Sequence, residues 1–173
     1  GGDVLHASFA DRLYEKRAVY NTYGPTETTV CAAYHRMETA DDPVPIGTPI
    51  ANRRIYILDP ALNPLPAGVF GEICISGAGT ARGYLNREEL TRETFIPHPF
   101  EPGKRLYRTG DMGRWLPDGT IEFLGRNDSQ VKIRGYRIEL GEIESRILAY
   151  EAVKEAVVIA RGKDEHKDLT AYL

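Results

Sequence analysis

Short apolar-rich runs, bounded by polar residues, prolines and glycines, fill the middle of the chain and predict β-strands. The clearest runs are Arg54–Asp59, Val69–Ser76, Arg105–Thr109, Gly113–Leu116 and Thr120–Leu124. Prolines and glycines separate them, and Pro117–Thr120 has the composition of a tight hairpin turn. Many short strands joined by such turns predict a small barrel or folded sheet from about Ile46 to Gly125.

Helical spacing of apolar residues is found near both ends of the chain, and a shorter helix is expected within the sheet region. The three predicted helices are Leu5–Arg17, Arg87–Phe95 and Leu140–Tyr150. Three further strands are predicted after residue 128: Gln130–Arg134, Val153–Ala160 and Asp168–Leu173. The composition changes at Gly125–Asp128, where a second, separate α+β unit is expected to begin. The fold class is therefore mixed α/β.

A loop at Asn21–Glu27 carries the first candidate chemistry. It lies between the strand-like runs Arg17–Tyr20 and Thr28–His35, and its Gly-Pro pair excludes a regular element. It offers an aromatic ring at Tyr23, a hydroxyl at Thr26 and a carboxylate at Glu27. These groups suit stacking on a base, binding a phosphate oxygen and holding Mg²⁺. On this loop alone, a plain turn with the tyrosine packed in a core explains the pattern at least as well.

Composition and charge narrow the functional classes. The net charge of −3 and the pI near 5.9 argue against a general nucleic-acid or membrane-surface binder. No apolar run is long enough to span a bilayer. Cys31 and Cys74 lie far apart, and the 4 His residues show no ligand spacing, so a reduced, cytoplasmic protein is expected. The chain starts without Met and stops in a strand-like run, as expected of an excised piece.

Four stretches together resemble the adenylate-forming, AMP-binding superfamily, and specifically the adenylation domains of non-ribosomal peptide synthetases. They are Asn21–Glu27, Gly71–Gly77 continuing to Ala81–Leu85, Tyr107–Asp111 and Gly125–Glu144. The stretch from Gly125 is the most specific, and the resemblance covers essentially the whole chain.

The resemblance implies a fold and a reaction. Residues 1–127 would be the C-terminal portion of the adenylation core, with an adenine- and substrate-pocket segment at 1–45 and a distorted β-barrel at 46–127. Residues 128–173 would begin a mobile C-terminal subdomain with its hinge at Asp128. The implied ligase joins ATP and an amino acid to give aminoacyl-AMP, then passes the acyl group to the phosphopantetheine thiol of a carrier domain. A condensation domain is expected in the same megaenzyme, and antibiotic biosynthesis is the implied setting.

The resemblance also assigns roles in the nucleotide site. Tyr23 would stack on adenine, with Asn21 at the base edge and Gly24 in the same nucleotide-binding loop. Thr26 would contact the α-phosphate, and Glu27 would hold Mg²⁺. The remaining assignments concern the ribose and the second unit: Asp111 would accept the ribose hydroxyls, Arg126 would donate to the ribose, and Gly135 would face the pantetheine channel.

The matching substrate-pocket positions are Gly1, Thr22, Val30 and Cys31, which are small, neutral and mostly apolar. They predict an amino acid with a neutral side chain, in which a large apolar or aromatic group would fit the space left by Gly1. The family's phosphate loop and its catalytic lysine would lie outside the chain. Residues 1–173 alone are therefore expected to be inactive.

Three alternatives remain open. A D-alanine–carrier ligase or an acyl- or aryl-CoA synthetase of the same superfamily would share Asp111, Arg126 and the adenine loop. A non-catalytic adenylation-like domain would bind nucleotide or a partner without turnover, although Glu27, Asp111 and Arg126 argue against decay. The third alternative is a purely structural barrel.

Overall fold

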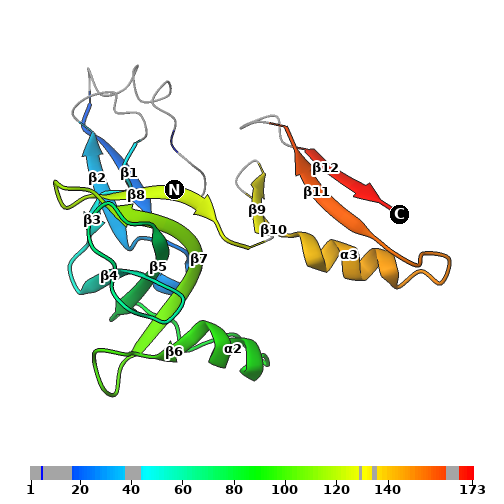
Figure 1. The fold of residues 1–173 in the computed structure, drawn as a ribbon, viewed down its shortest axis with the longest axis horizontal. Coiled ribbons are helices and arrows are strands. Elements are labelled where there is room, and N and C mark those ends of the chain that lie inside the picture. The colour runs from blue at the N-terminus through cyan, green and yellow to red at the C-terminus, as the bar shows by residue number, and fades with distance from the viewer. Residues whose placement is uncertain (1–4, 6–16, 38–43, 129, 134–135, 163–167) are drawn as a thin grey trace. The chain divides into compact units, whose positions relative to one another are not determined.

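The computed structural model describes residues 5, 17–37, 44–128, 130–133, 136–162 and 168–173. Gly1 and almost all of the helix expected at Leu5–Arg17 lie outside these residues. The described part is mostly β-structure and forms two compact units (Figure 1). One unit ends at Asn127 and the other begins at Asp128.

The first unit opens with a three-stranded antiparallel sheet. Its strands are β1 (Val19–Tyr23), β2 (Ala33–Met37) and β3 (Thr48–Pro49), in the order β1-β2-β3. A single 3-10 turn, η1 (Thr26–Thr28), lies in the connection from β1 to β2.

A five-stranded antiparallel sheet makes up the rest of this unit, in the order β4-β5-β7-β6 with β8 paired to β7. The strands are β4 (Arg53–Leu58), β5 (Gly71–Gly77), β6 (Phe95–Pro97), β7 (Arg105–Trp115) and β8 (Ile121–Arg126). The short helix α2 (Glu88–Thr94) precedes β6. The sheet curls as a half-barrel along the long ribbon of β7 (Figure 1), which confirms the predicted mixed α/β fold with a barrel-like sheet.

The prediction of two short strands around Gly110-Asp111 is wrong, because β7 runs through both residues. Gly110 has a φ of 71°, and the pairing of β7 shifts register against β5 and again against β8. These irregularities bend the strand without ending it, because hydrogen bonds to both neighbours continue on either side. A glycine that breaks a local pattern therefore marks a bend in β7.

The main core fills the space between the two sheets. Apolar side chains from β4, β5 and β8 meet residues of the first sheet and its flanks in one cluster: Tyr23, Ala32, Ala33, Ile46, Ile55, Ile57, Ile73, Ile75 and Ile121. A second cluster joins Leu58, Cys74 and Leu106. Strand β5 is thus buried on both faces, which explains why the consecutive residues Ile73, Cys74 and Ile75 are all apolar. Burial raises the pKa of the Cys74 thiol to about 12, so Cys74 serves as a small core residue.

The second unit contains two antiparallel strand pairs and one helix. Strands β9 (Gln130–Ile133) and β10 (Tyr136–Glu139) pair, as do β11 (Val157–Arg161) and β12 (Asp168–Tyr172). Helix α3 (Leu140–Leu148) lies between them in the sequence, and Glu144 on it accepts a hydrogen bond of 2.8 Å from the Val158 N–H.

The strand predicted at Val153–Ala160 starts later, at Val157. The preceding residues instead form turns, in which the Tyr150 N–H donates to Ile147 and the Val153 N–H donates to Tyr150. Gly135 lies outside the described residues. Among the helices that the structure describes, none is long and apolar enough to cross a bilayer.

Gly47 joins the two sheets of the first unit. Its carbonyl accepts a hydrogen bond of 2.9 Å from the Ile121 N–H of β8, and its Cα lies against β2. A Cβ at this position would lie 1.9 Å from the Tyr34 carbonyl oxygen, and the φ of 84° already disfavours a side chain. Only glycine allows the backbone to pass between the sheets here.

We expect Gly47→Ala to destabilise the chain by about 3 kcal/mol or more, because it adds a backbone clash to an unfavourable φ. Gly119 is a matched control, since it has a φ of 83° but nothing lies within 4 Å of the point that an alanine Cβ would occupy. Gly119→Ala should cost only about 1 kcal/mol. Urea unfolding of both variants measures the difference, and equal losses would contradict the role given to Gly47.

Candidate nucleotide site

The connection from β1 to β2 is a compact turn, so the strand predicted from Thr28 is wrong over Thr28–Ala32. Thr29 and Val30 have φ values of 61° and 67°, in the left-handed region that residues with side chains do not adopt in a regular strand. The Cys31 N–H donates to the Thr29 carbonyl at 2.7 Å. The β-branched residues that favoured a strand here are held in left-handed conformations by the surrounding contacts.

Gly24 is the residue against which this turn closes. The Ala32 N–H donates to the Tyr23 carbonyl at 2.7 Å, which brings the end of the turn back to the end of β1. A Cβ at Gly24 would lie 2.6 Å from the Val30 carbonyl oxygen and 2.7 Å from the Ala32 nitrogen. The absence of a side chain at Gly24 therefore fixes the path of the whole loop.

Glu27, in η1, is largely buried, and both its backbone carbonyl and its side-chain carboxylate accept hydrogen bonds. Its Oε1 accepts a hydrogen bond of 2.7 Å from the Tyr84 hydroxyl, and its carbonyl accepts one of 2.8 Å from the Ala81 N–H. The Thr29 hydroxyl donates to the Gly79 carbonyl at 2.8 Å. The candidate metal ligand is thus bound to segment 77–84, a bend that contains Gly77, Gly79 and Gly83.

Two arginines hold this bend in place. The Arg105 guanidinium donates to the carbonyls of Arg82 at 2.5 Å and Ala81 at 2.8 Å. The Arg53 guanidinium donates to the Thr28 carbonyl at 3.1 Å and lies directly against Gly79, where a Cβ would displace it. Four hydrogen bonds to distant segments thereby fix the bend, and the Arg53 bond to Thr28 fixes η1 beside it.

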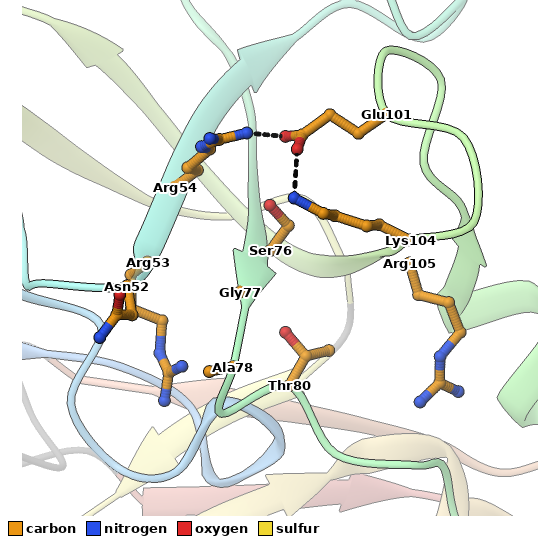
Figure 2. A pocket seen from close by; sticks show the side chains of 10 residues that line it. All are labelled: Asn52, Arg53, Arg54, Ser76, Gly77, Ala78, Thr80, Glu101, Lys104 and Arg105. Carbon is orange, nitrogen blue, oxygen red and sulfur yellow. Dashed lines mark hydrogen bonds and ion pairs between the residues drawn. The ribbon is translucent and has the colours of Figure 1, made fainter.

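A polar pocket of about 650 Å³ opens beside the same bend, lined by Asn52, Arg53, Arg54, Ser76, Gly77, Ala78, Thr80, Glu101, Lys104 and Arg105 (Figure 2). Glu101 is paired with Arg54 and, at 2.6 Å, with Lys104. These hydrogen bonds, first from Lys104 and then from Arg54, lower the pKa of Glu101 to about 2. The pocket's cations are therefore engaged within the protein.

Asp111 is the centre of a second cluster. Only 3% of its surface is exposed, and its Oδ2 accepts a hydrogen bond of 2.5 Å from the Tyr23 hydroxyl. Its Oδ1 accepts one of 2.7 Å from Arg126, its cross-strand partner on β8. A buried carboxylate needs a cation and hydrogen-bond donors to stay ionised, and the structure supplies both.

The protonation of Tyr23 follows from the same contacts. Burial raises the pKa of the Tyr23 phenol well above its usual value, and the neighbouring Asp111 carboxylate raises it further. The phenol therefore remains a hydrogen-bond donor across the physiological range. Its ring lies tilted against Phe123, with 6.2 Å between ring centroids.

The other predicted site residues are spread around these clusters. The Asn21 amide is buried and donates to the Pro45 carbonyl at 2.8 Å. Thr26 is exposed at the start of η1. Among the predicted pocket residues, Thr22 and Val30 are exposed, Cys31 is partly buried, and Gly1 lies outside the described residues. The structure thus brings Tyr23, Asp111 and Arg126 into contact and sets Glu27 in a separate cluster.

The donor set around Glu27 is suited to a magnesium–nucleotide complex. Within the described residues no group of three or more His, Cys, Asp or Glu side chains could hold a metal by itself. Mg²⁺ commonly uses one or two carboxylates together with substrate phosphates, so a single fixed carboxylate is a fitting contribution.

Tyr84 is the residue at this site that sequence reasoning missed. It lies 57 positions from Glu27, and no local pattern connects the two. The only signal for it was its place at the end of the segment Ala81–Leu85.

Comparisons with known proteins identify the family of the chain. Residues 1–85 match the family model described as AMP-binding enzyme. Bacitracin synthase 1 of Bacillus licheniformis is 54% identical over 100% of this chain, and tyrocidine synthase 1 of Brevibacillus parabrevis is 54% identical over 95% of it. The chain spans only 4% and 15% of the lengths of these two relatives.

Solved structures give the same result. Holo-PA1221, described as a non-ribosomal peptide synthetase protein with adenylation and PCP domains, superposes with a TM-score of 0.87 at 33% identity, over 99% of this chain and 31% of its own. The four-domain synthetase holo-AB3403, bound to AMP and glycine, matches with a TM-score of 0.69 at 42% identity, over 99% and 13%.

The chain belongs to the family of AMP-binding enzymes. Within that family it is a partial adenylation domain of the non-ribosomal peptide synthetase type.

We expect Tyr23→Phe to cost about 1.5–3 kcal/mol of stability, because it removes one donor from the buried Asp111 carboxylate while keeping the ring. Tyr34→Phe is the matched control, since Tyr34 lies on the neighbouring strand with 43% of its surface exposed. Denaturant unfolding measures both, and a Tyr23→Phe variant as stable as Tyr34→Phe would contradict the network around Asp111.

Proposed function

We propose that this chain is the part of an amino-acid-activating ligase that binds the nucleotide. The full protein would join ATP and an amino acid to form aminoacyl-AMP and pyrophosphate. It would then transfer the acyl group to the phosphopantetheine thiol of a carrier domain, within a cytoplasmic peptide synthetase that also contains a condensation domain. The observation that carries this proposal is the buried Asp111 carboxylate, oriented by Tyr23 and Arg126 at the bend of β7.

Asp111 is proposed to bind the ribose. A carboxylate has about four acceptor positions, so it can accept ribose hydroxyls in addition to protein donors. Arg126 is paired with Asp111 at 2.7 Å and would itself donate to the ribose. The adenine would lie by the loop from Asn21 to Gly24, with Tyr23 supplying the aromatic surface and Asn21 the polar contact to the base edge.

Thr26 and Glu27 are proposed to act at the phosphates. Thr26 is exposed at the start of η1, so its hydroxyl can contact an α-phosphate oxygen. Glu27 would hold Mg²⁺, which when bound reduces the repulsion between the amino-acid carboxylate and the α-phosphate. The contribution of these residues is to position and neutralise the reacting anions, because the first step needs no covalent nucleophile from the protein.

The amino acid is proposed to have a neutral side chain. Thr22, Val30 and Cys31 lie on β1 and the following turn, and no charged group is among them. A charged side chain would lack a partner at these positions. Gly1, the fourth proposed pocket residue, is outside the described part of the chain.

Asp128 is proposed as the hinge for the second unit. It is the first residue of that unit, and its Oδ1 accepts a hydrogen bond of 3.1 Å from the Gln130 N–H. A hinge requires a terminal position that can absorb a change in φ and ψ, and the boundary between two compact units is such a position. Gly135 would then approach the carrier's pantetheine arm in the thioester-forming state.

We expect the longer protein that contains this segment to catalyse ATP–pyrophosphate exchange with one neutral amino acid. Asp111→Ala should lower that exchange by at least about 100-fold, because it removes both the ribose acceptor and the carboxylate that holds Arg126 in place. Asp118→Ala is the matched control, since Asp118 is an exposed carboxylate in the β7–β8 turn.

Exchange in a panel of amino acids tests both parts of the proposal. Preference for Lys, Arg, Asp or Glu would contradict the pocket assignment alone. Activity with fatty or aryl acids and with no amino acid would move the protein to the acyl-CoA branch, and an active Asp111→Ala variant would refute the ribose role.

A further inference from the structure

We propose that Tyr84 is a positioning residue for the metal-binding carboxylate: its hydroxyl fixes Glu27 Oε1 so that the carboxylate is ready for Mg²⁺ before the nucleotide arrives. This inference rests on the proposed role of Glu27. The contact that carries it is the 2.7 Å hydrogen bond from the Tyr84 hydroxyl to Glu27 Oε1.

The Tyr84 ring is held in place independently of Glu27. It packs edge-on against Phe95, with 5.5 Å between ring centroids and 66° between ring planes, and Phe95 is only 4% exposed. The Tyr84 N–H donates to the Thr91 hydroxyl of α2 at 2.9 Å. Both anchors lie on the α2–β6 segment, so the position of the phenol is set by contacts other than the one to Glu27.

The backbone of the bend is tied to the same glutamate. The Ala81 N–H donates to the Glu27 carbonyl at 2.8 Å, while Arg105 holds the carbonyls of Ala81 and Arg82. Arg105 also lies over the Phe95 ring, with its guanidinium carbon 5.6 Å from the centroid. The segment therefore fixes Glu27 at two points, its carbonyl and its carboxylate oxygen.

Fixing the carboxylate has a direct consequence for metal binding. A free glutamate samples several rotamers, and binding a metal must select one of them. A hydrogen bond from a donor that is itself held by other contacts makes that selection in advance. Groups that orient a metal ligand in this way commonly change metal affinity by about 10–100-fold when they are removed.

The test uses Tyr84→Phe in the longer protein, because this change keeps the ring packed on Phe95 and removes only the hydroxyl. Tyr56→Phe is the matched control, since the Tyr56 hydroxyl donates to a different carboxylate, Glu101, at 3.0 Å. Two properties are measured: Mn²⁺ affinity in the presence of a non-hydrolysable ATP analogue, by electron paramagnetic resonance, and the Mg²⁺ dependence of pyrophosphate exchange.

We expect Tyr84→Phe to weaken Mn²⁺ binding by about tenfold and to raise the half-saturating Mg²⁺ concentration by a similar factor. The exchange rate at saturating Mg²⁺ should stay within about twofold of the wild type, since the reacting groups are unchanged. Tyr56→Phe should alter neither property. Unchanged metal dependence in Tyr84→Phe, or a lower maximal rate with no shift in metal affinity, would overturn the inference.

Glu27→Gln separates this inference from the proposal on which it rests. If Glu27→Gln abolishes Mn²⁺ binding and Tyr84→Phe has no effect, the positioning role fails and the proposed function stands. If Glu27→Gln itself leaves Mn²⁺ binding intact, the metal role of Glu27 fails, and the role of Tyr84 fails with it.

Discussion

The buried carboxylate of Asp111 is the constraint on which the first unit depends. A carboxylate that is 3% exposed is stable only with a cation and hydrogen-bond donors beside it. Tyr23 comes from β1, Asp111 from β7 and Arg126 from β8, so meeting this requirement joins the small sheet to the large one. The bend in β7 at Gly110 accompanies a register shift against β5 that spans Asp111 and one against β8 just after Met112. The pairing of the buried Asp111 carboxylate and the curvature of the sheet therefore depend on the same part of β7.

The loop that follows β1 is built by a different kind of contact. It contains no regular element longer than η1, yet its backbone and side chains bind the bend at 77–84 and the Arg53 guanidinium. A loop held in this way can present an exposed Thr26 and an oriented Glu27 without a helix or strand to support them. Rigid support of loop residues by distant segments is what a site for two repelling anions requires.

Much of the fold could be predicted from local sequence patterns. The apolar-rich runs of β4 and β5, the turn at Pro117–Thr120 and the spacing of α3 all reflect interactions between near neighbours. The errors occurred where distant contacts override local preference. Thr29 and Val30 favour a strand, but closure of the turn on Gly24 forces positive φ values on both.

In the candidate site, too, the sequence pointed to some residues but not to the contacts between distant segments. A resemblance in four motifs pointed to Asp111, Arg126 and Glu27, and the structure pairs the first two directly. No spacing rule indicates that a tyrosine hydroxyl 57 residues away would contact Glu27, or that Arg105 would bind two carbonyls of the bend. Such contacts depend on how the whole sheet curls, which the sequence pattern leaves undetermined.

Nucleotide binding to the longer protein tests the central claim most directly, through paired titrations of ATP and 2′,3′-dideoxy-ATP against wild type and Asp111→Asn. If Asp111 accepts the ribose hydroxyls, the wild type should bind ATP about 10–100-fold more tightly than the dideoxy analogue, because hydrogen bonds to a charged group are strong. Asp111→Asn should lose most of that preference. Equal discrimination by the two proteins would contradict the account, because the ribose would then be recognised elsewhere.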